Sequence, residues 1–244
     1  MKLSVVVPAR NEEGCLEKVI VEVVGELSKE NIENEIIIVN DNSTDSTPQI
    51  IEKLIKRFPN VRVFHRSLPS GFGRAVKDGL QIVSGDVVII AMGDASDDPG
   101  DIVKYFRKIE EGYDCVFGSR FIRGAIIKDY PSGKLILNRM ANTFIRYLFS
   151  IRNNDITNAF KAYRVKVIRA VMPLISNYFN ITVEIPLKAI VRGFSCATIP
   201  ISWHGRESGV SKYRLSELQR KYLFSLLYVW LEKILLKDEI KNRG

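Results

Sequence analysis

Short runs of β-branched and apolar residues recur along the first half of the chain and alternate with segments of helical periodicity. The apolar runs lie at residues 3–7, 35–39, 61–64, 87–91 and 115–117. Helical patterns lie at residues 12–28, 48–57, 73–83 and 99–111. Strands that are apolar on both faces and alternate with helices predict an α/β fold, with a mostly parallel central sheet flanked by helices.

This alternation breaks down after residue 117. We expect a loop over residues 118–133, helices over 134–149 and 181–192, and a further strand over 195–203. Residues 205–212 are rich in glycine, serine and positive charge, which is typical of a mobile flap over a site. A chain of this length often forms one domain, and we place it at residues 1–215, followed by a helical extension over 216–244.

The C-terminal segment has apolar residues at helical spacing and basic residues beside them. The apolar positions are Leu223, Leu226, Leu227, Trp230, Leu231, Ile234 and Leu235. This pattern predicts an amphipathic helix, which can lie on a membrane surface. A helix that packs on its own domain or on a second subunit explains the pattern equally well. The apolar stretch 222–231 is shorter than the roughly 20 residues that span a bilayer.

The formal net charge of +8 favours anionic partners such as phosphates, nucleic acid or an acidic membrane. The arginines and lysines are scattered and carboxylates stand at the ends of predicted strands, which argues against nucleic acid. Cys15, Cys115 and Cys196 are widely spaced in apolar settings, as is typical of reduced thiols. The start of the chain lacks a signal-peptide pattern. We therefore expect a cytoplasmic protein, associated at most peripherally with the cytoplasmic face of a membrane.

An acidic cluster, Gly93-Asp94-Ala95-Ser96-Asp97-Asp98-Pro99, follows the apolar run at 87–91. Aspartate oxygens are hard ligands, and in open α/β sheets ligands gather beyond the carboxyl ends of the strands. Asp94 and Asp98 are therefore candidate ligands of Mg²⁺ or Mn²⁺, with a bound diphosphate completing the coordination. Asp98 before Pro99 is also typical of a helix N-cap followed by proline, and one aspartate can serve both purposes.

Other polar residues follow the first two predicted strands. Arg10 and Glu12 follow the first strand, and Asp41 follows the second, where a carboxylate can accept hydrogen bonds from a ribose or a base. The residues after Asp41 also fit a simple turn before a helix. Gly71-Phe72-Gly73 lacks the full dinucleotide fingerprint, which argues against a nicotinamide-dependent dehydrogenase.

Three basic residues are candidate phosphate ligands. Arg120 stands in Gly118-Ser119-Arg120, and Arg206 and Lys212 bound the predicted flap. Guanidinium groups bind phosphate oxygens bidentately, whereas lysine acts as a point charge.

The order of these motifs resembles the family 2 glycosyltransferases with the GT-A (Rossmann-like) fold, and most closely the dolichol-phosphate mannose synthase branch. The resemblance covers residues 3–215 and rests on segments 7–12, 39–43, 71–73, 94–99, 118–120, 155–160 and 206–212. It implies inverting, metal-dependent transfer of mannose or another hexose from a GDP- or UDP-sugar to a polyprenyl (dolichyl) phosphate. The alternatives are a soluble glycan or protein acceptor, or a non-catalytic nucleotide-sugar-binding protein.

The resemblance also implies roles for single residues. Around the nucleoside it places Pro8, Arg10, Glu12, Val39 and Asp41. Around the metal and diphosphate it places Asp94, Ala95, Ser96 and Asp98. For gripping phosphate it implies Arg120, Arg206 and Lys212. On the acceptor side it implies Lys134, Asn138 and Arg139, and around the sugar Thr157 and Asn158, with Glu184 nearby. The residues expected to carry the chemistry are Asp94, Asp98, Arg206 and Lys212.

Two residues depart from the mannose synthase pattern. Ser96 stands where those enzymes usually carry a second aspartate, and Asp98 where they usually carry glutamine. The carboxylate has therefore been moved along the motif, which leaves the preferred ion and the donor open. The acceptor phosphate, with a second pKa of about 6, is already ionised and needs no catalytic base. His65 and His204 fall in no acid/base or metal-ligand spacing, and we expect both to be structural.

Overall fold

The computed structural model describes residues 1–205 and 215–241, and side chains for residues 1–205 and 220–236. The first half alternates strands and helices in the order β1 (Leu3–Ala9), α1 (Leu16–Lys29), β2 (Asn34–Asn40), α2 (Thr47–Arg57), β3 (Val61–His65), α3 (Phe72–Gln81), β4 (Val87–Ile90) and α4 (Pro99–Glu110). The second half contains β5 (Cys115–Ser119), β6 (Ile126–Lys128), α5 (Ser132–Phe149), β7 (Lys161–Arg164), α6 (Val165–Ala170), α7 (Ile181–Val191), β8 (Cys196–Pro200), β9 (Ser202–His204) and α8 (Leu215–Lys241).

The central sheet has seven strands in the order β3-β2-β1-β4-β7-β5-β8. All neighbouring pairs are parallel except those that involve β7, which runs antiparallel to both β4 and β5. The predicted α/β fold with a mostly parallel sheet is confirmed. Strand β7 was not predicted, because it begins and ends with the charged residues Lys161 and Arg164 and so lacks an apolar run.

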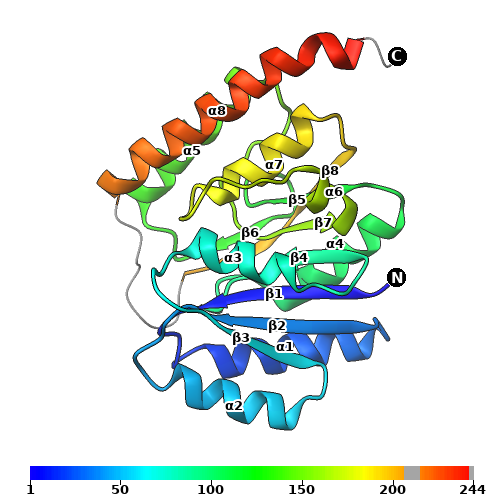
Figure 1. Ribbon diagram of the computed structural model, residues 1–244, viewed down its shortest axis with the longest axis vertical. Coiled ribbons are helices and arrows are strands. Elements are labelled where there is room, and N and C mark those ends of the chain that lie inside the picture. Colours follow the sequence, from blue (N-terminus) through cyan, green and yellow to red (C-terminus); the bar gives the residue numbers. More distant parts are fainter. Residues whose placement is uncertain (206–214, 242–244) are drawn as a thin grey trace.

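Helices cover both faces of the sheet (Figure 1). Alternate residues of β1 point to opposite sides: Val5 and Val7 belong to one apolar cluster with residues of α1, α2 and α4, whereas Val6 belongs to the other cluster, with residues of α3, α6 and α7. Strands β1, β2, β4 and β5 are thus covered on both sides, which explains why they are continuous apolar runs.

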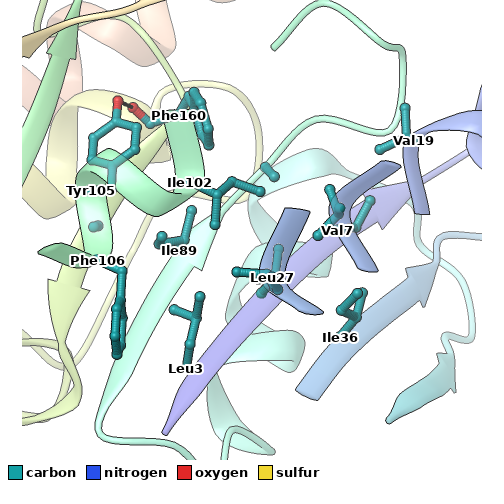
Figure 2. Close-up of a cluster of buried hydrophobic side chains, with 14 of the residues drawn as sticks. Leu3, Val7, Val19, Leu27, Ile36, Ile89, Ile102, Tyr105, Phe106 and Phe160 are labelled. Carbon is teal, nitrogen blue, oxygen red and sulfur yellow. Dashed lines mark hydrogen bonds between the residues drawn. The ribbon is translucent and has the colours of Figure 1, made fainter. Parts of the chain in front are cut away.

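Figure 2 shows the first of these clusters, where side chains of α1 and α4 meet those of β1, β2 and β4. Tyr105 of α4 lies at its edge, and its hydroxyl donates a 2.6 Å hydrogen bond to the carbonyl oxygen of Phe160. A side chain at Gly118, at the end of β5, would overlap the Tyr105 hydroxyl. Glycine at position 118 is therefore required by close packing, at the point where β5 leads into Arg120.

Two further details differ from the sequence-based expectations. The segment 118–133, predicted as a loop, contains β6, which pairs with β9 in a two-stranded sheet. The single strand predicted over 195–203 is divided between β8 and β9. Both differences occur around Ile201. The chain pairs with β5 up to Pro200, and from Ser202 onward it pairs with β6 instead.

The C-terminal helix α8 packs against α7 and shares the domain's core. Leu226 and Val229 are buried in the second apolar cluster. Ser225 is also buried, and its hydroxyl accepts a 2.8 Å hydrogen bond from Nδ2 of Asn180. The apolar residues predicted to form one side of this helix therefore lie on two sides, because Leu226 faces the domain whereas Leu227 and Leu231 face outward. No helix within residues 1–205 and 215–241 is long and apolar enough to cross a membrane.

Candidate active site

The carboxyl ends of three adjacent parallel strands form the candidate site. Strand β1 lies between β2 and β4, so the residues that follow these strands meet at one edge of the sheet. Arg10 follows β1, Asp41 follows β2, and Asp94 lies in the loop after β4. The convergence expected from the sequence is present.

Asp41 is nearly buried and is held by two other segments of the chain. Its Oδ1 accepts a 2.5 Å hydrogen bond from Nη1 of Arg66, and its Oδ2 accepts a 2.8 Å bond from the backbone N–H of Gly71. Arg66 also donates from Nε to Asp78 of α3. Arg66 was not singled out from the sequence, because nothing in its local context indicates that it neutralises Asp41.

The other residues expected around the nucleoside differ in exposure. Pro8 and Val39 are buried register partners on β1 and β2, so their side chains belong to the sheet interior. Arg10 is exposed at the end of β1. The backbone N–H of Glu12 donates a 2.9 Å hydrogen bond to Thr47, which anchors the loop after β1 to the start of α2.

The acidic loop after β4 is held in a tight turn. Ala95 has a left-handed backbone conformation, with φ of +60°, which residues other than glycine rarely adopt. The backbone N–H of Ser96 donates to Oδ1 of Asp94, and that of Met92 donates to Oδ2 of Asp97. Oδ1 of Asp98 accepts a 2.8 Å bond from the N–H of Gly100 and caps α4. The N-cap interpretation of Asp98 is thus correct.

Asp94 and Asp97 share an electrostatic environment. Burial, and then the negative charge of Asp94, raise the pKa of Asp97 to about 7. The two carboxylates together form an oxygen-rich site that a divalent cation would stabilise. Asp97 was not singled out from the sequence, because it stands between the two motif positions that drew attention, Ser96 and Asp98.

Within the described part of the chain, no group of three or more His, Cys, Asp or Glu side chains could hold a metal ion. Asp94 and Asp97 are two carboxylates close enough to interact electrostatically, so a cation held by them would take further ligands from a bound molecule. This composition fits Mg²⁺ or Mn²⁺, which in phosphate-transfer sites are held by one or two carboxylates together with phosphate oxygens and water.

Arg120 follows β5 and forms a buried, two-pronged ion pair with Asp155. Its Nε lies 2.8 Å from Oδ2 and its Nη2 lies 2.7 Å from Oδ1 of Asp155. Although burial opposes the charge, the Asp155 carboxylate raises the pKa of Arg120 above its usual value. Its guanidinium carbon lies 5.5 Å from the ring centre of Tyr130 and 5.9 Å from that of Trp203. Two donors of Arg120 are thus already engaged within the protein.

Strand β9 closes over the acidic loop. Trp203 forms an isolated antiparallel bridge with Asp97, and the backbone N–H of His204 donates a 3.0 Å bond to the carbonyl oxygen of Ser96. His65 lies elsewhere, with Nδ1 3.0 Å from Nδ2 of Asn40. The ring of His65 thus contacts Asn40, whereas His204 contacts the acidic loop through its backbone. Arg206 and Lys212, with the rest of the predicted flap beyond Gly205, lie outside the described residues.

Polar contacts tie α5 to the loop before β7. Thr157 Oγ1 accepts hydrogen bonds of 2.9 Å and 2.8 Å from Nδ2 of Asn138 and of Asn142. Asn158 is also buried, and its Nδ2 is among the few buried polar atoms of the described residues without a hydrogen-bond partner. Thr157 therefore has a structural role, whereas Asn158 has an unused donor.

The remaining acceptor-side residues lie in different surroundings. Arg139 lies on an exposed part of α5, 4.5 Å from the ring centre of Phe121, and Lys134 is exposed near the start of that helix. Glu184 is fully buried, and its carboxylate accepts hydrogen bonds from the backbone N–H groups of Ile175 and Ser176. The carboxylate of Glu184 thus holds the segment that precedes α7.

The family follows from a sequence model of "Glycosyl transferase family 2", which matches residues 4–172. The chain belongs to glycosyltransferase family 2. The predictions of the family and of a glycosyltransferase are thus confirmed.

Curated relatives align with most of this glycosyltransferase. Polyprenol monophosphomannose synthase of Mycolicibacterium smegmatis is 29% identical over 221 residues, which cover 88% of this chain and 82% of the relative. Dolichol-phosphate mannosyltransferase of Pyrococcus furiosus is also 29% identical over 221 residues, but these cover 60% of that longer protein.

Solved structures share the fold. Glucosyl-3-phosphoglycerate synthase from Mycobacterium tuberculosis, in complex with Mn²⁺, UDP and glucosyl-3-phosphoglycerate, superposes with a TM-score of 0.72 at 19% identity, covering 93% of this chain and 79% of that one. The same enzyme with Mg²⁺ and UDP gives a TM-score of 0.71 at 18% identity with the same coverage. The GT-A fold expected for this family 2 glycosyltransferase is thus confirmed.

Proposed function

We propose that this glycosyltransferase transfers a hexose from a nucleoside diphosphate sugar to a polyprenyl phosphate, with inversion at the anomeric carbon. The observation that carries the proposal is the placement of Asp41 and the pair Asp94–Asp97 at one sheet edge, in a chain that aligns over most of its length with two polyprenol or dolichol phosphate mannosyltransferases. The names of these two relatives support mannose as the hexose of this chain, and we expect a GDP- or UDP-sugar as the donor.

In this reaction, an oxygen of the acceptor phosphate attacks the anomeric carbon, and the bond from that carbon to the donor diphosphate breaks. The acceptor is a phosphate monoester, largely ionised at neutral pH, so the protein need not remove a proton. Its tasks are to position both substrates and to compensate charge on the departing nucleoside diphosphate. The described site accordingly presents carboxylates and cations without a His-based proton relay.

The residues of this chain divide these tasks. Asp41, oriented by Arg66, accepts hydrogen bonds from the base or ribose. Asp94 with Asp97 holds Mg²⁺ or Mn²⁺, and Asp98 remains a predicted ligand in addition to its role as a cap. The ion, when bound, neutralises negative charge on the diphosphate. Arg206 and Lys212 are expected to contact phosphate, and the unused Nδ2 of Asn158 offers a donor to a sugar hydroxyl.

We also propose that the protein attaches peripherally to a membrane, on the cytoplasmic face, where it meets its lipid acceptor. Helices α5 and α8 lie side by side at one end of the molecule (Figure 1). Their outer faces expose large apolar side chains, namely Ile136, Met140, Phe144 and Tyr147 on α5 and Phe224, Leu227, Leu231 and Leu235 on α8. We call these eight residues the outer apolar face.

The spacing and the surroundings of the outer apolar face support this attachment. The four residues on α5 recur every three or four positions and so share one side of that helix, as do the four on α8. Exposed apolar patches of this kind mark interaction sites. Basic residues are exposed on or next to the same helices at Arg139, Arg146, Arg152 and Arg220. Anionic lipid headgroups attract such residues, while the apolar side chains enter the interface.

The first experiment is a transfer assay with a panel of GDP- and UDP-sugars, Mg²⁺ or Mn²⁺, and a short polyprenyl phosphate. Asp94→Asn is the test variant, and Glu17→Gln, at an exposed position of α1, removes the same charge as a control. We expect metal-dependent glycolipid from the wild type and from Glu17→Gln, and at least a hundredfold less from Asp94→Asn. If a donor binds but no glycolipid forms, the acceptor assignment is wrong, and soluble glycans and proteins become the acceptors to test.

A further inference from the structure

A cavity of about 470 Å³ lies beside α3, on the side of that helix turned away from the sheet. It is formed by α3 and by the segment that joins α6 to α7. Its lining residues are Arg66, Arg74, Lys77, Asp78, Gln81, Met172, Pro173, Leu174 and Asn177. Arg66 also pairs with Asp41, so the cavity adjoins the donor site, but the other lining residues are not among those expected around the nucleoside, the metal or the diphosphate.

The basic side chains that line the cavity differ in whether a carboxylate pairs with them. Arg66 contacts both Asp41 and Asp78, at 2.5 Å in each case. Arg74 donates to the carbonyl oxygen of Ser70, and Lys77 donates to the carbonyl oxygen of Leu174 and to Oδ1 of Asn177. In the part of the chain that the structure describes, neither Arg74 nor Lys77 forms an ion pair. The cavity therefore holds two cations without a carboxylate partner.

These two cations are held in place. Arg74 and Lys77 are three residues apart on α3, so they lie on the same side of the helix. The guanidinium carbon of Arg74 lies 5.5 Å from the ring centre of Tyr178. The 2.6 Å bond from Lys77 to Asn177 fixes the lysine side chain. Burial lowers the pKa of Lys77, and a bound anion would offset that cost by stabilising the ammonium.

The remaining lining residues indicate what kind of organic group the rest of the ligand would be. Met172, Pro173 and Leu174 supply an apolar side to the cavity. The side-chain amide of Gln81 adds a neutral polar group at the rim. A volume of about 470 Å³ is in the range of small-molecule sites and exceeds what an inorganic anion alone would fill. A ligand with one anionic end and a small organic body matches this combination.

We propose that this cavity binds a soluble phosphate monoester, with the phosphate between Arg74 and Lys77 and the organic part against the Met172–Leu174 wall. Guanidinium and ammonium groups are the usual phosphate ligands of proteins, and the apolar wall supplies contact area for the remainder. The two proposed phosphate ligands, Arg74 and Lys77, are not among the residues assigned to the transfer reaction, and Arg66 is the one lining residue shared with the donor site.

The test is calorimetric titration of the full chain with phenyl phosphate, in EDTA so that no divalent ion supports anion binding near Asp94. The test variant is Arg74→Gln/Lys77→Gln. Lys53→Gln, at an exposed position of α2, is the charge control, and Asp94→Asn reports on the donor site. We expect binding that weakens at least tenfold in the double variant and stays within about twofold of the wild type in both others.

Two results would overturn the proposal: no binding of phenyl phosphate to the wild type, or binding that UDP or GDP displaces and that the double variant retains. The second result would assign the anion to the donor site. If the double variant unfolds, the single variants Lys77→Gln and Lys77→Arg replace it. Lys77→Arg keeps the charge and should retain binding, whereas a purely steric role of Lys77 predicts equal loss in both.

Discussion

Phe72 and Phe179 stack face to face, with ring centres 4.4 Å apart and 7° between the ring planes. Phe72 is the first residue of α3, which begins beside Asp41, and Phe179 lies just before α7. The stack therefore connects the start of α3, beside Asp41, to the start of α7, the helix against which α8 packs. A double-mutant cycle with Phe72→Leu and Phe179→Leu should give a coupling energy of about 0.5–1.5 kcal/mol in urea unfolding. A coupling of zero would mean that the two rings act independently.

Gly118→Ala should destabilise the protein by about 1–3 kcal/mol, because the added methyl group overlaps the Tyr105 hydroxyl and approaches Ile201. Tyr105→Phe removes the overlapping oxygen, at the cost of the hydrogen bond to Phe160. The combined variant should therefore be more stable than the sum of the two single effects predicts. Urea unfolding of the four proteins measures this, and strict additivity would show that the hydroxyl is not the obstacle.

Asp97→Asn and Asp98→Asn separate metal binding from helix capping. Asparagine caps a helix about as well as aspartate, so Asp98→Asn keeps the bond to Gly100 and changes only the charge. If Asp94 and Asp97 form the metal site, Asp97→Asn should weaken Mn²⁺ binding in the presence of UDP or GDP by about tenfold or more. Asp98→Asn should change it less. Manganese titration by electron paramagnetic resonance measures both, and the reverse order would assign the site to Asp98.

Lys161 should make the free energy of unfolding depend on pH in the neutral to alkaline range. Its Nζ is buried and donates to the carbonyl oxygens of Ile156 and Thr182. Burial, opposed by Asp155, lowers its pKa to about 7 from 10.5. The unfolded chain thus binds more protons between these values, and stability rises with pH by at most about 1.4 kcal/mol per unit.

Lys161→Met should remove this rise, whatever its effect on absolute stability. The measurement is urea unfolding of both proteins at about pH 7.5 and about pH 9.5, where the titration lies. Lys53→Met, at an exposed site, serves as the control and should keep the wild-type pH dependence. Equal pH dependence in the wild type and Lys161→Met would show that Lys161 stays charged in the fold.

The triple variant Phe144→Ser/Phe224→Ser/Leu231→Ser removes part of the outer apolar face without touching the buried side of either helix. Binding to vesicles that contain anionic lipid should weaken roughly tenfold or more, because apolar area no longer enters the interface. Leu68→Ser, at an exposed leucine between β3 and α3, is the matched control. Vesicle flotation measures binding. A triple variant that floats like the wild type would show that the outer apolar face does not attach the protein to membranes.

The sequence predicts the architecture well where one local signal is sufficient. Apolar runs identify β1, β2, β4 and β5 because both faces of those strands are buried, and Asp98 before Pro99 gives the start of α4. Roles that depend on distant partners were not predictable. Asp155 occupies two donors of Arg120, and Glu184 holds the chain before α7, through contacts between segments that no spacing reveals. Arg66 was missed for the same reason, because its partners Asp41 and Asp78 lie on other segments.

Strand β7 has a consequence for the order in which the domain is completed during synthesis. It lies between β4, which pairs with it along Lys161–Arg164, and β5, which pairs with it along Lys161–Tyr163. The β1–β4 half can form from consecutive βαβ units soon after it leaves the ribosome. Strand β5 must wait for residues synthesised more than forty positions later, because only β7 joins it to the rest of the sheet. Four residues in the second half of the chain thus decide when the two parts of the sheet join.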